Sequence, residues 1–350
     1  MSFRIGIVGC GLIGSRRAGV TRELGEKVVL VADVDAARAR GLAEENGVEW
    51  SNDWQRVVSH PDIDIVVVST VNKVLAPVTV AALRGGKHVL CEKPLGRNIA
   101  EALDMVEAAR QADRVLKVGF NHRHHPAVRK ANELCNQGAI GPLMFIRAVY
   151  GHGGRPGYHK EWRGNADLAG GGELLDQGVH IVDLCRWFMG DFSEVFGCIG
   201  TYFWDLGYFE MVDSYQLSAG RRQLEDNAFA LLRTADGRVA QIHTSWTQWN
   251  NCFRFEVFGR DGYVRVDGLG GSYGMERLEL GRRKAEGGAP DVELQEFSGP
   301  DRSWHAEWQE FTSAIREGRE PMANGEDGLQ AMRLIAAIYE SAQAGRVVRL

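Results

Sequence analysis

The first third of the chain alternates short Val/Ile-rich runs with helix-length segments. The apolar runs are FRIGIV, KVVLVAD, DIVVVST, KHVLCE and VLKVGF, and stretches such as IAEALDMVEAAR separate them. Strands that are apolar along their whole length and joined by helical crossovers pair in parallel, with both faces of the sheet covered. The pattern therefore predicts a doubly wound α/β domain over residues 1–122.

The character of the sequence changes after about residue 121. Longer alternating runs follow from Leu143, and Asp-Gly pairs at 236–237 and 261–262 join two pairs of runs, which is a strong hairpin signal. We expect a second, α+β domain over residues 123–350 with a mostly antiparallel sheet. Its expected helices are Glu173 to Met189, Trp304 to Arg316 and Gly325 to Ala344.

Charge and composition limit the partners of the chain. A net charge of −5 argues against nucleic acid or an anionic membrane as partner, and no apolar run is long enough for a membrane span. The one basic cluster, Gly281 to Lys284, is interpreted as a solvated loop. The N-terminus lacks the pattern of a secretory signal, and the six cysteines are scattered, so we expect a cytoplasmic protein with reduced thiols.

A glycine-rich stretch, IVGCGLIGSRRAG, follows the first expected strand. It places Gly9, Gly11 and Gly14 in G-x-G-x-x-G spacing at the start of a helix, where backbone N–H groups and the helix dipole attract phosphate. Asp33 ends the next strand, about 20 residues further on, where a dinucleotide site needs an acid for the ribose hydroxyls. This combination predicts a Rossmann-type dinucleotide site rather than a structural turn.

The acidic residues favour NAD over NADP. Asp33, with Asp35 nearby, would repel a 2′-phosphate. Arg16 and Arg17 could in principle meet that phosphate, but we expect both on exposed turns of the helix.

A second concentration of signal is GGGELLDQGVHIVDLCRWF, from Gly170 to Phe188. A helix would place Asp176, His180 and Asp183 on one face. An imidazole beside a carboxylate can move a proton to and from an alcohol, with Asp183 orienting His180 and Asp176 binding a hydroxyl. The alternatives are a plain surface helix and a metal cluster that includes Glu173; we predict no metal, because nothing else in the sequence requires one.

These motifs, with EKP at Glu92 to Pro94 and GFNHRHHP after the fifth strand, resemble the glucose-fructose oxidoreductase, inositol dehydrogenase and MocA family over nearly the whole chain. The resemblance implies an NAD-binding Rossmann domain, an open antiparallel sheet in the second domain, and a homodimer or homotetramer formed through that sheet. It also implies hydride transfer between nicotinamide and a secondary alcohol of a sugar, cyclitol or nucleotide sugar.

The resemblance further assigns roles to single residues. Lys93 would polarise the substrate oxygen, held by a cis peptide to Pro94 with Glu92 as structural partner, while Asp176 would bind substrate and His180 would act as base. One departure is the segment STVNKVLAP, where Val71 stands in place of the family's proline and no histidine follows. The residues predicted to bind the dinucleotide are Gly9, Gly11, Leu12, Ile13, Gly14, Asp33, Val34, Thr70, Asn72, Glu92 and Lys93.

The loop from Tyr150 to Asn165 precedes the catalytic helix and offers aromatic and cationic side chains for a sugar. An ordinary surface loop is the alternative interpretation. We also expect Trp246 and Trp249 to lie on opposite faces of a strand, in packing or interface roles. The predicted substrate-binding residues are Lys93, Arg123, Tyr158, Trp162, Arg163, Asp176 and His180.

Two other functions fit the same motifs. The first is a glycosidase that oxidises the sugar transiently at C3, uses NAD catalytically and yields no net NADH. The second is a nucleotide-bound regulator without turnover, which would not need Lys93, Asp176 and His180 together. An NAD-dependent dehydrogenase therefore remains the leading prediction.

Overall fold

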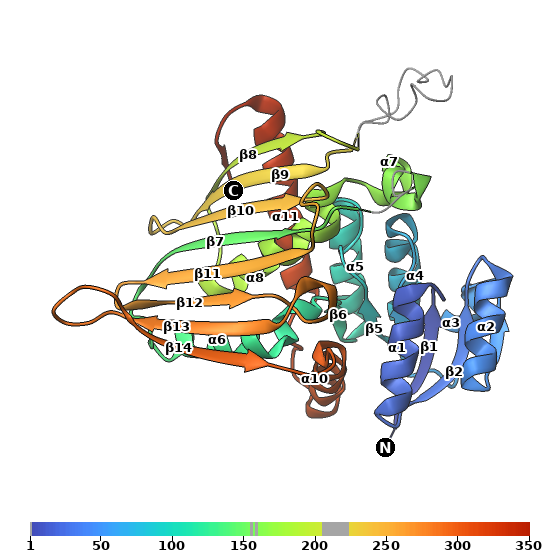
Figure 1. The fold of residues 1–350 in the computed structure, drawn as a ribbon. Coiled ribbons are helices and arrows are strands. Elements are labelled where there is room, and N and C mark those ends of the chain that lie inside the picture. Colours follow the sequence, from blue (N-terminus) through green and yellow to red (C-terminus); the bar gives the residue numbers. More distant parts are fainter. Residues whose placement is uncertain (1, 155–156, 158–159, 205–223) are drawn as a thin grey trace. The chain divides into compact units, whose positions relative to one another are not determined.

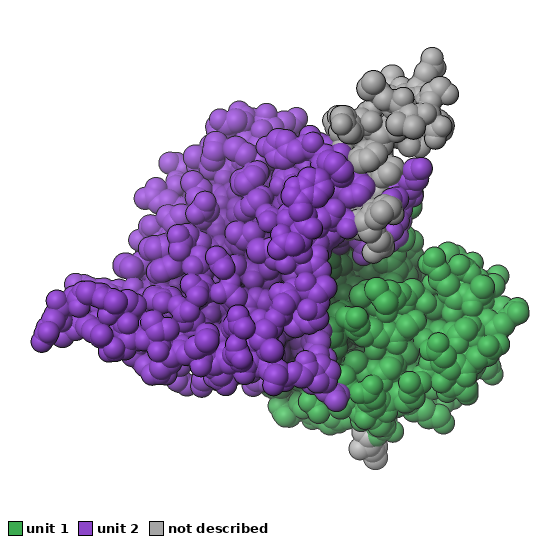
Figure 2. All heavy atoms as spheres, in the orientation of Figure 1, with its two compact units in different colours: residues 1–121, 167–170, 304–332 green, residues 122–166, 171–303, 333–350 purple. Residues whose placement is uncertain are grey.

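The computed structural model describes residues 2–154, 157, 160–204 and 224–350. Its internal contacts divide the chain into two compact units, coloured separately in Figure 2. Unit 1 comprises residues 1–121, 167–170 and 304–332, and unit 2 comprises residues 122–166, 171–303 and 333–350. The chain thus leaves unit 1 at residue 121 and returns to it twice, so the units are not the continuous segments 1–122 and 123–350.

Unit 1 contains a six-stranded sheet in which every pairing is parallel, as the sequence predicts. Its edge strand β3 is only three residues long and was not among the expected strands. In spatial order the strands are β3 (Glu49–Ser51), β2 (Lys27–Ala32), β1 (Arg4–Val8), β4 (Ile65–Val68), β5 (His88–Cys91) and β6 (Leu116–Val118).

The helices of unit 1 begin at local sequence signals. Asp35 caps α2 by accepting from the backbone N–H groups of Ala37 and Arg38, and Asn98 caps α5 by accepting from Glu101 N–H. No side chain caps α1, whose N-terminal residue follows Gly11. The helices are α1 (Leu12–Glu23), α2 (Ala36–Asn46), α3 (Gln55–Val58), α4 (Asn72–Arg84) and α5 (Ile99–Ala112).

Helix α10 (Ser303–Glu317) comes from the far end of the sequence but completes the core of unit 1. Its Trp308 and Phe311 are buried in one cluster with Ile5, Ile7 and Leu90 of the sheet. The predicted bounds of α10 agree with the structure to within one residue at each end. The predicted bounds of α11 (Gly325–Ala344) match the structure. Residues 325–332 of α11 belong to unit 1 and residues 333–344 to unit 2.

Unit 2 contains a nine-stranded sheet that is antiparallel except for the parallel pair β7 and β10. Both Asp-Gly turns join antiparallel neighbours, β9 to β10 and β11 to β12, which confirms the two predicted hairpins. In spatial order the strands are β14 (Asp291–Phe297), β13 (Glu276–Arg282), β12 (Gly262–Asp267), β11 (Cys252–Gly259), β7 (Leu143–Gly151), β10 (Val239–Ser245), β9 (Asn227–Arg233), β8 (Glu194–Gly200) and β15 (Val348–Arg349) (Figure 1).

One face of this sheet is covered by helices. Helix α8 (Val179–Met189) packs against β7 and β10, and α6 (Pro126–Asn136) packs against β12 and β13 (Figure 1). Strand residues alternate accordingly: Ile146, Ala148 and Tyr150 of β7 are buried. The opposite face exposes side chains such as Phe229 and Leu231 of β9. The substrate-side motifs therefore lie on the helix-covered face.

Two sequence interpretations in unit 2 were wrong. The basic cluster at Gly281 to Lys284 is not a simple loop, because Gly281 and Arg282 end β13 and Lys284 pairs with Asp291 at 3.1 Å. Strand β10 ends at Ser245, so Trp246 and Trp249 do not alternate on a strand. Trp246 is buried, whereas Trp249 is 70% exposed and has a φ of 60°.

Of the helices formed by the described residues, none combines the length and the apolar character needed to cross a bilayer.

Trp308→Ala tests whether α10 belongs to the core of unit 1. Trp308 is 1% exposed, so its truncation should lower the free energy of unfolding by about 3–5 kcal/mol. The matched control Trp249→Ala removes an exposed ring and should change it by about 0.5 kcal/mol or less. Urea unfolding followed by circular dichroism measures both; equal, small changes would contradict the assignment of α10 to the core.

Candidate active site

The glycine loop of unit 1 joins β1 to α1 in a conformation that requires glycine at two positions. Gly9 has a φ of 96°, and a Cβ on Gly14 would lie 1.8 Å from the Gly9 carbonyl oxygen. A Cβ on Gly11 would meet nothing within 4 Å, so the space beside the uncapped start of α1 is open. The loop therefore brings bare backbone N–H groups to a helix N-terminus, as a pyrophosphate site requires.

Asp33 lies beside this loop at the end of β2. Its Oδ2 accepts from Cys10 N–H at 2.7 Å, and its Oδ1 accepts from Asp35 N–H at 2.9 Å. Two apolar neighbours, Leu12 and Val34, are 77% and 89% exposed. An open backbone cradle, an acid and exposed apolar side chains together fit the phosphates, ribose and adenine of a dinucleotide.

Cys10 lies within the same loop, but its thiol is unreactive. Burial, and secondarily the charge of Asp33, raise its pKa to about 12. The thiol therefore stays protonated near neutral pH, which disfavours a role as nucleophile.

Behind the end of β5, Arg17 of α1 is fully buried between two carboxylates. It donates from Nε and Nη2 to Glu92 Oε1, at 2.9 and 2.6 Å, and its Nη1 pairs with Glu307 of α10. The expectation that Arg17 is exposed was therefore wrong, whereas Arg16 is exposed. Glu92, expected to be the structural partner of Lys93, accepts hydrogen bonds from Arg17, so its carboxylate is held within the core of unit 1.

Lys93 follows Glu92 directly and is half-buried. The peptide between Lys93 and Pro94 is cis, as the resemblance implied. Thr70 and Asn72 follow β4, and Asn72 begins α4. The Asn72 side chain is buried and donates to the Ala169 carbonyl at 2.8 Å, which holds the segment 167–170 of unit 1.

In unit 2 the predicted helix contains an irregular first part. Residues Leu174–Gly178 form a π-helical turn, η4, which continues into α8. π-Helical turns are rare in proteins, and those that occur are often found at functional sites. This turn carries Asp176.

The start of this helix is anchored by a buried carboxylate. Glu225 accepts from the backbone N–H groups of Gly172 and Leu174, at 3.2 and 3.1 Å, and from the Tyr339 hydroxyl at 2.7 Å. Burial raises the pKa of Glu225, although these hydrogen bonds act in the opposite direction. Glu225 thus fixes the backbone from which the side chain of Asp176 extends.

Three residues predicted to bind substrate lie together in unit 2. Arg163 donates from Nε to Asp176 Oδ2 at 3.0 Å, and its guanidinium lies 4.4 Å from the centre of the Trp162 ring. Both Trp162 and Arg163 come from the short turn η3 (Trp162–Gly164). The loop that precedes η4 and the π-helical turn itself are therefore joined by an ion pair between two candidate substrate ligands.

His180 follows one turn after Asp176 and is buried among aromatic rings. Its imidazole stacks on that of His122, with ring centres 3.8 Å apart and an interplanar angle of 24°. Tyr150 of β7 meets His180 edge-on at 6.3 Å. The ring of the predicted base is thus held on a packed surface.

Arg123 and Asp183 form a buried ion pair in unit 2. Arg123 Nε donates to Asp183 Oδ2 at 2.8 Å and Nη2 donates to Oδ1 at 2.6 Å, and the side chains are 4% and 1% exposed. Both carboxylate oxygens of Asp183 thus bind the turn η1 (Asn121–His124) rather than water. This geometry favours a positioning role for Arg123, whereas its role as a substrate ligand stays a prediction.

The sequence pattern did not single out three polar side chains near Asp176. Gln177 donates to the Tyr273 hydroxyl at 3.4 Å, and Tyr273 lies against Tyr150 with ring centres 5.5 Å apart. Burial raises the pKa of both tyrosines, so both hydroxyls stay protonated near neutral pH. Tyr273 comes from η5 (Gly271–Tyr273), about 100 residues away from Asp176, and no local pattern reveals that proximity.

Tyr158, with His159 and Arg155 of the same loop, lies outside the described residues, and its predicted substrate contact stays a prediction. Among the residues that the structure describes, no cluster of three or more His, Cys, Asp or Glu side chains could hold a metal ion.

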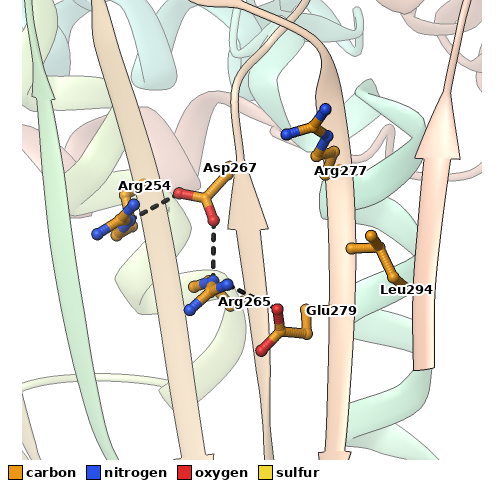
Figure 3. A pocket seen from close by; sticks show the side chains of 6 residues that line it. All are labelled: Arg254, Arg265, Asp267, Arg277, Glu279 and Leu294. Carbon is orange, nitrogen blue, oxygen red and sulfur yellow. Dashed lines mark hydrogen bonds and ion pairs between the residues drawn. The ribbon is translucent and has the colours of Figure 1, made fainter. Parts of the chain in front are cut away.

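A surface hollow of about 390 Å³ lies elsewhere in unit 2, over strands β11 to β14 (Figure 3). Its charged groups are paired with one another: Arg254 with Asp267 at 2.6 Å, and Arg265 with Asp267 and Glu279 at 2.8 and 2.6 Å. Arg277 of the same wall pairs with Glu296. The charged side chains of the hollow thus neutralise one another through ion pairs. None of the predicted site residues lines the hollow.

The fold and the glycine loop define a dinucleotide-binding oxidoreductase. Residues 3–120 match the oxidoreductase family with an NAD-binding Rossmann fold, and residues 128–265 match the GFO/IDH/MocA C-terminal domain. The chain therefore belongs to the GFO/IDH/MocA family of oxidoreductases. This membership confirms the predicted family, the NAD cofactor and the enzymatic class.

Individual relatives cover nearly the whole chain. A 1,5-anhydro-D-fructose reductase of Ensifer adhaerens is 32% identical over 99% of this chain and 98% of its own length. A myo-inositol 2-dehydrogenase of Thermotoga maritima is 28% identical, with 99% and 98% covered. The crystal structure of an aldose-aldose oxidoreductase from Caulobacter crescentus, complexed with glycerol, has a TM-score of 0.85 at 28% identity and full coverage of both chains.

Three glycine substitutions test the cofactor loop. Gly14→Ala should lower both the melting temperature and NAD affinity, because its methyl group meets the Gly9 carbonyl. Gly11→Ala should keep the melting temperature but weaken NAD binding roughly tenfold or more, about 1.4 kcal/mol, by filling the space beside the backbone. The control is Gly19→Ala, because Gly19 lies inside α1 and a Cβ there would also meet no atom within 4 Å; this variant should bind NAD normally. Calorimetric titration reads the affinity; unchanged binding in Gly11→Ala would contradict the assigned loop.

Asp183→Asn tests the buried ion pair. The substitution keeps the shape but leaves the Arg123 charge uncompensated, so the free energy of unfolding should fall by about 3–5 kcal/mol. Glu107→Gln, which breaks an exposed pair with Arg110, is the matched control and should leave the free energy of unfolding nearly unchanged. Similar losses in the two variants, measured by urea unfolding, would show that the Arg123–Asp183 pair is not structurally important.

Proposed function

We propose that the protein is an NAD-dependent dehydrogenase that transfers a hydride between a secondary alcohol of a sugar, cyclitol or nucleotide sugar and the nicotinamide. The observation that carries the proposal is in unit 2, where one helix presents Asp176, ion-paired with Arg163, and the ring-packed imidazole of His180 one turn later. A carboxylate that can accept from a hydroxyl, followed by an imidazole, suits the removal of a proton from an alcohol.

The cofactor-binding set remains as the sequence predicts it, with two changes of emphasis. Gly9, Gly11 and Gly14 would hold the pyrophosphate, Asp33 the ribose hydroxyls, and Leu12, Ile13 and Val34 the apolar surroundings. Thr70 and Asn72 stay candidates near the nicotinamide ribose, although the Asn72 amide also holds Ala169. Glu92 supports the site through Arg17 rather than as a direct ligand. Asp33 and Asp35 favour NAD, with NADP less suited.

The roles in the reaction follow from the chemistry of the side chains. In the oxidation direction His180 takes the proton of the substrate hydroxyl, Asp176 orients a neighbouring hydroxyl, and Lys93 stabilises the negative charge that develops on the oxygen. NAD, when bound, supplies the hydride acceptor. The secondary alcohol becomes a ketone, with its proton on His180, and the reverse direction uses the same groups.

The substrate class rests on the relatives and on the chemistry of η3. The named relatives act on an anhydro sugar, on myo-inositol and on aldoses. Trp162 offers an aromatic face for the CH groups of a ring, and Arg163 a donor for hydroxyl or acidic groups. These three relatives are named as a reductase, a dehydrogenase and an oxidoreductase, so a glycosidase is not proposed.

We further propose a homodimer or homotetramer formed through the outer face of the nine-stranded sheet. That face exposes Phe196 (38%), Phe229 (40%) and Leu231 (48%) on adjacent strands, and such apolar patches favour association. We also propose a cytoplasmic location, because all six cysteines are unpaired in the structure, as expected for a reducing compartment.

The proposal is tested by an absorbance screen for NADH with inositols, aldoses, uronates and nucleotide sugars, each with NAD and NADP. On the best substrate, Lys93→Met and His180→Ala should each lower kcat by about a hundredfold or more, and His180→Ala should keep NAD binding. The exposed Lys27→Met is the matched control and should turn over normally. Unchanged turnover in both site variants would refute the mechanism, and the absence of NADH formation with every substrate would refute the function.

A further inference from the structure

His122 makes the closest ring contact to the predicted base. The two imidazoles stack with centres 3.8 Å apart, and His122 and His180 are 5% and 4% exposed. We propose that His122 is a positioning residue that fixes the plane of the His180 imidazole and, as a second imidazole, restricts the stacked pair to a single proton. This inference rests on the proposed function, in which His180 is the base.

The position of His122 is fixed by contacts of the residues that follow it in the chain. The next residue, Arg123, is held by two hydrogen bonds to Asp183, on the same helix as His180. His125 contacts Glu276 of β13 at 3.2 Å and also meets the His122 ring edge-on at 5.6 Å. Because the turn η1 is tied directly to α8, the two rings cannot slide past one another without breaking a buried ion pair.

Aromatic neighbours limit the tilt of the His122 ring. Tyr150 of β7 meets it at 5.1 Å with an interplanar angle of 64°, and Phe253 of β11 lies 5.8 Å away. An alanine at position 122 would therefore leave a ring-sized gap against His180, whereas a phenylalanine would preserve the flat surface. This difference separates the steric role of His122 from its ability to carry a proton.

Two protonated imidazoles in direct stacking would be like charges inside the protein, so the second proton is bound much more weakly than the first. The titratable or charged groups near the pair are Glu173, which precedes η4, Asp176 of η4, Asp183 with Arg123, His125 with Glu276, and the tyrosines Tyr150 and Tyr273. The Arg123 and Asp183 charges cancel, and both tyrosines stay neutral near neutral pH.

This arrangement suits a base that is charged only during turnover. While His122 is neutral, an imidazolium on His180 lies over a π face, which stabilises a cation. If His122 carried the proton instead, His180 would be a poorer base. The protonation of the pair, and not of His180 alone, therefore sets the acid limb of the pH–rate profile.

The steric role is tested by kcat on the substrate found in the screen. His122→Ala should lower kcat about a hundredfold, with KM for NAD unchanged, because the base loses its alignment. His122→Phe restores the flat surface and should recover kcat to within about tenfold of the unsubstituted protein. The control His60→Phe, in the turn after α3, should leave kcat unchanged. Equal kcat in all variants, or a folded His122→Phe as impaired as His122→Ala, would overturn the positioning role.

The electrostatic role is tested without substrate or NAD, by NMR titration of Cε1-labelled histidines in the full chain. The His180 signal, assigned from His180→Gln, should titrate in two steps in the unsubstituted protein and in one step in His122→Phe. An identical His180 curve in both, or a His180 that does not titrate, would overturn the shared proton. Because this measurement needs no turnover, it can fail while the dehydrogenase activity stands, and it can succeed where that activity is absent.

Discussion

The candidate catalytic helix depends on one buried ion pair, between Arg123 and Asp183. A carboxylate that is 1% exposed is tolerated only because the guanidinium binds both of its oxygens. The pair joins the first turn of unit 2 to the second turn of α8, and so determines which surface His180 packs against. The position of the helix therefore depends on a structural requirement, the neutralisation of the buried Asp183 charge. Arg123, which lies 60 residues earlier in the chain, meets that requirement.

Unit 1 uses the same device behind its own ligand-facing edge. Arg17 is completely buried, and its partners Glu92 and Glu307 lie at the end of β5 and in α10. One cation thus connects the helix that follows the glycine loop, the residue before Lys93 and the helix that completes the core. A helical pattern with two adjacent arginines gives no sign of this, because the burial of Arg17 depends on a helix that begins almost 300 residues later.

The sequence predicted those parts of the fold whose signals are local. Continuous apolar runs predicted the parallel sheet, Asp-Gly pairs predicted two hairpins, and apolar periodicity located α8, α10 and α11. The strands that were not expected are β3, β13, β14 and β15: β3 and β15 have only three and two residues, and β14 is exposed along almost its whole length. They are strands because a neighbouring strand offers an unpaired edge, which is a property of the assembled sheet.

The site divides in the same way. Spacing alone placed Asp176, His180 and Asp183 on one helix, but their partners come from elsewhere: Arg163 from η3, His122 from η1 and Arg123 beside it. The partners change the roles. Asp183, which lies one turn beyond His180, has both carboxylate oxygens bound to Arg123 of η1. Asp176, 13% exposed in the π-helical turn, is paired with Arg163. Of two acids on one helix face, burial thus favours a structural role for Asp183, and the partial exposure of Asp176 fits the substrate role proposed for it.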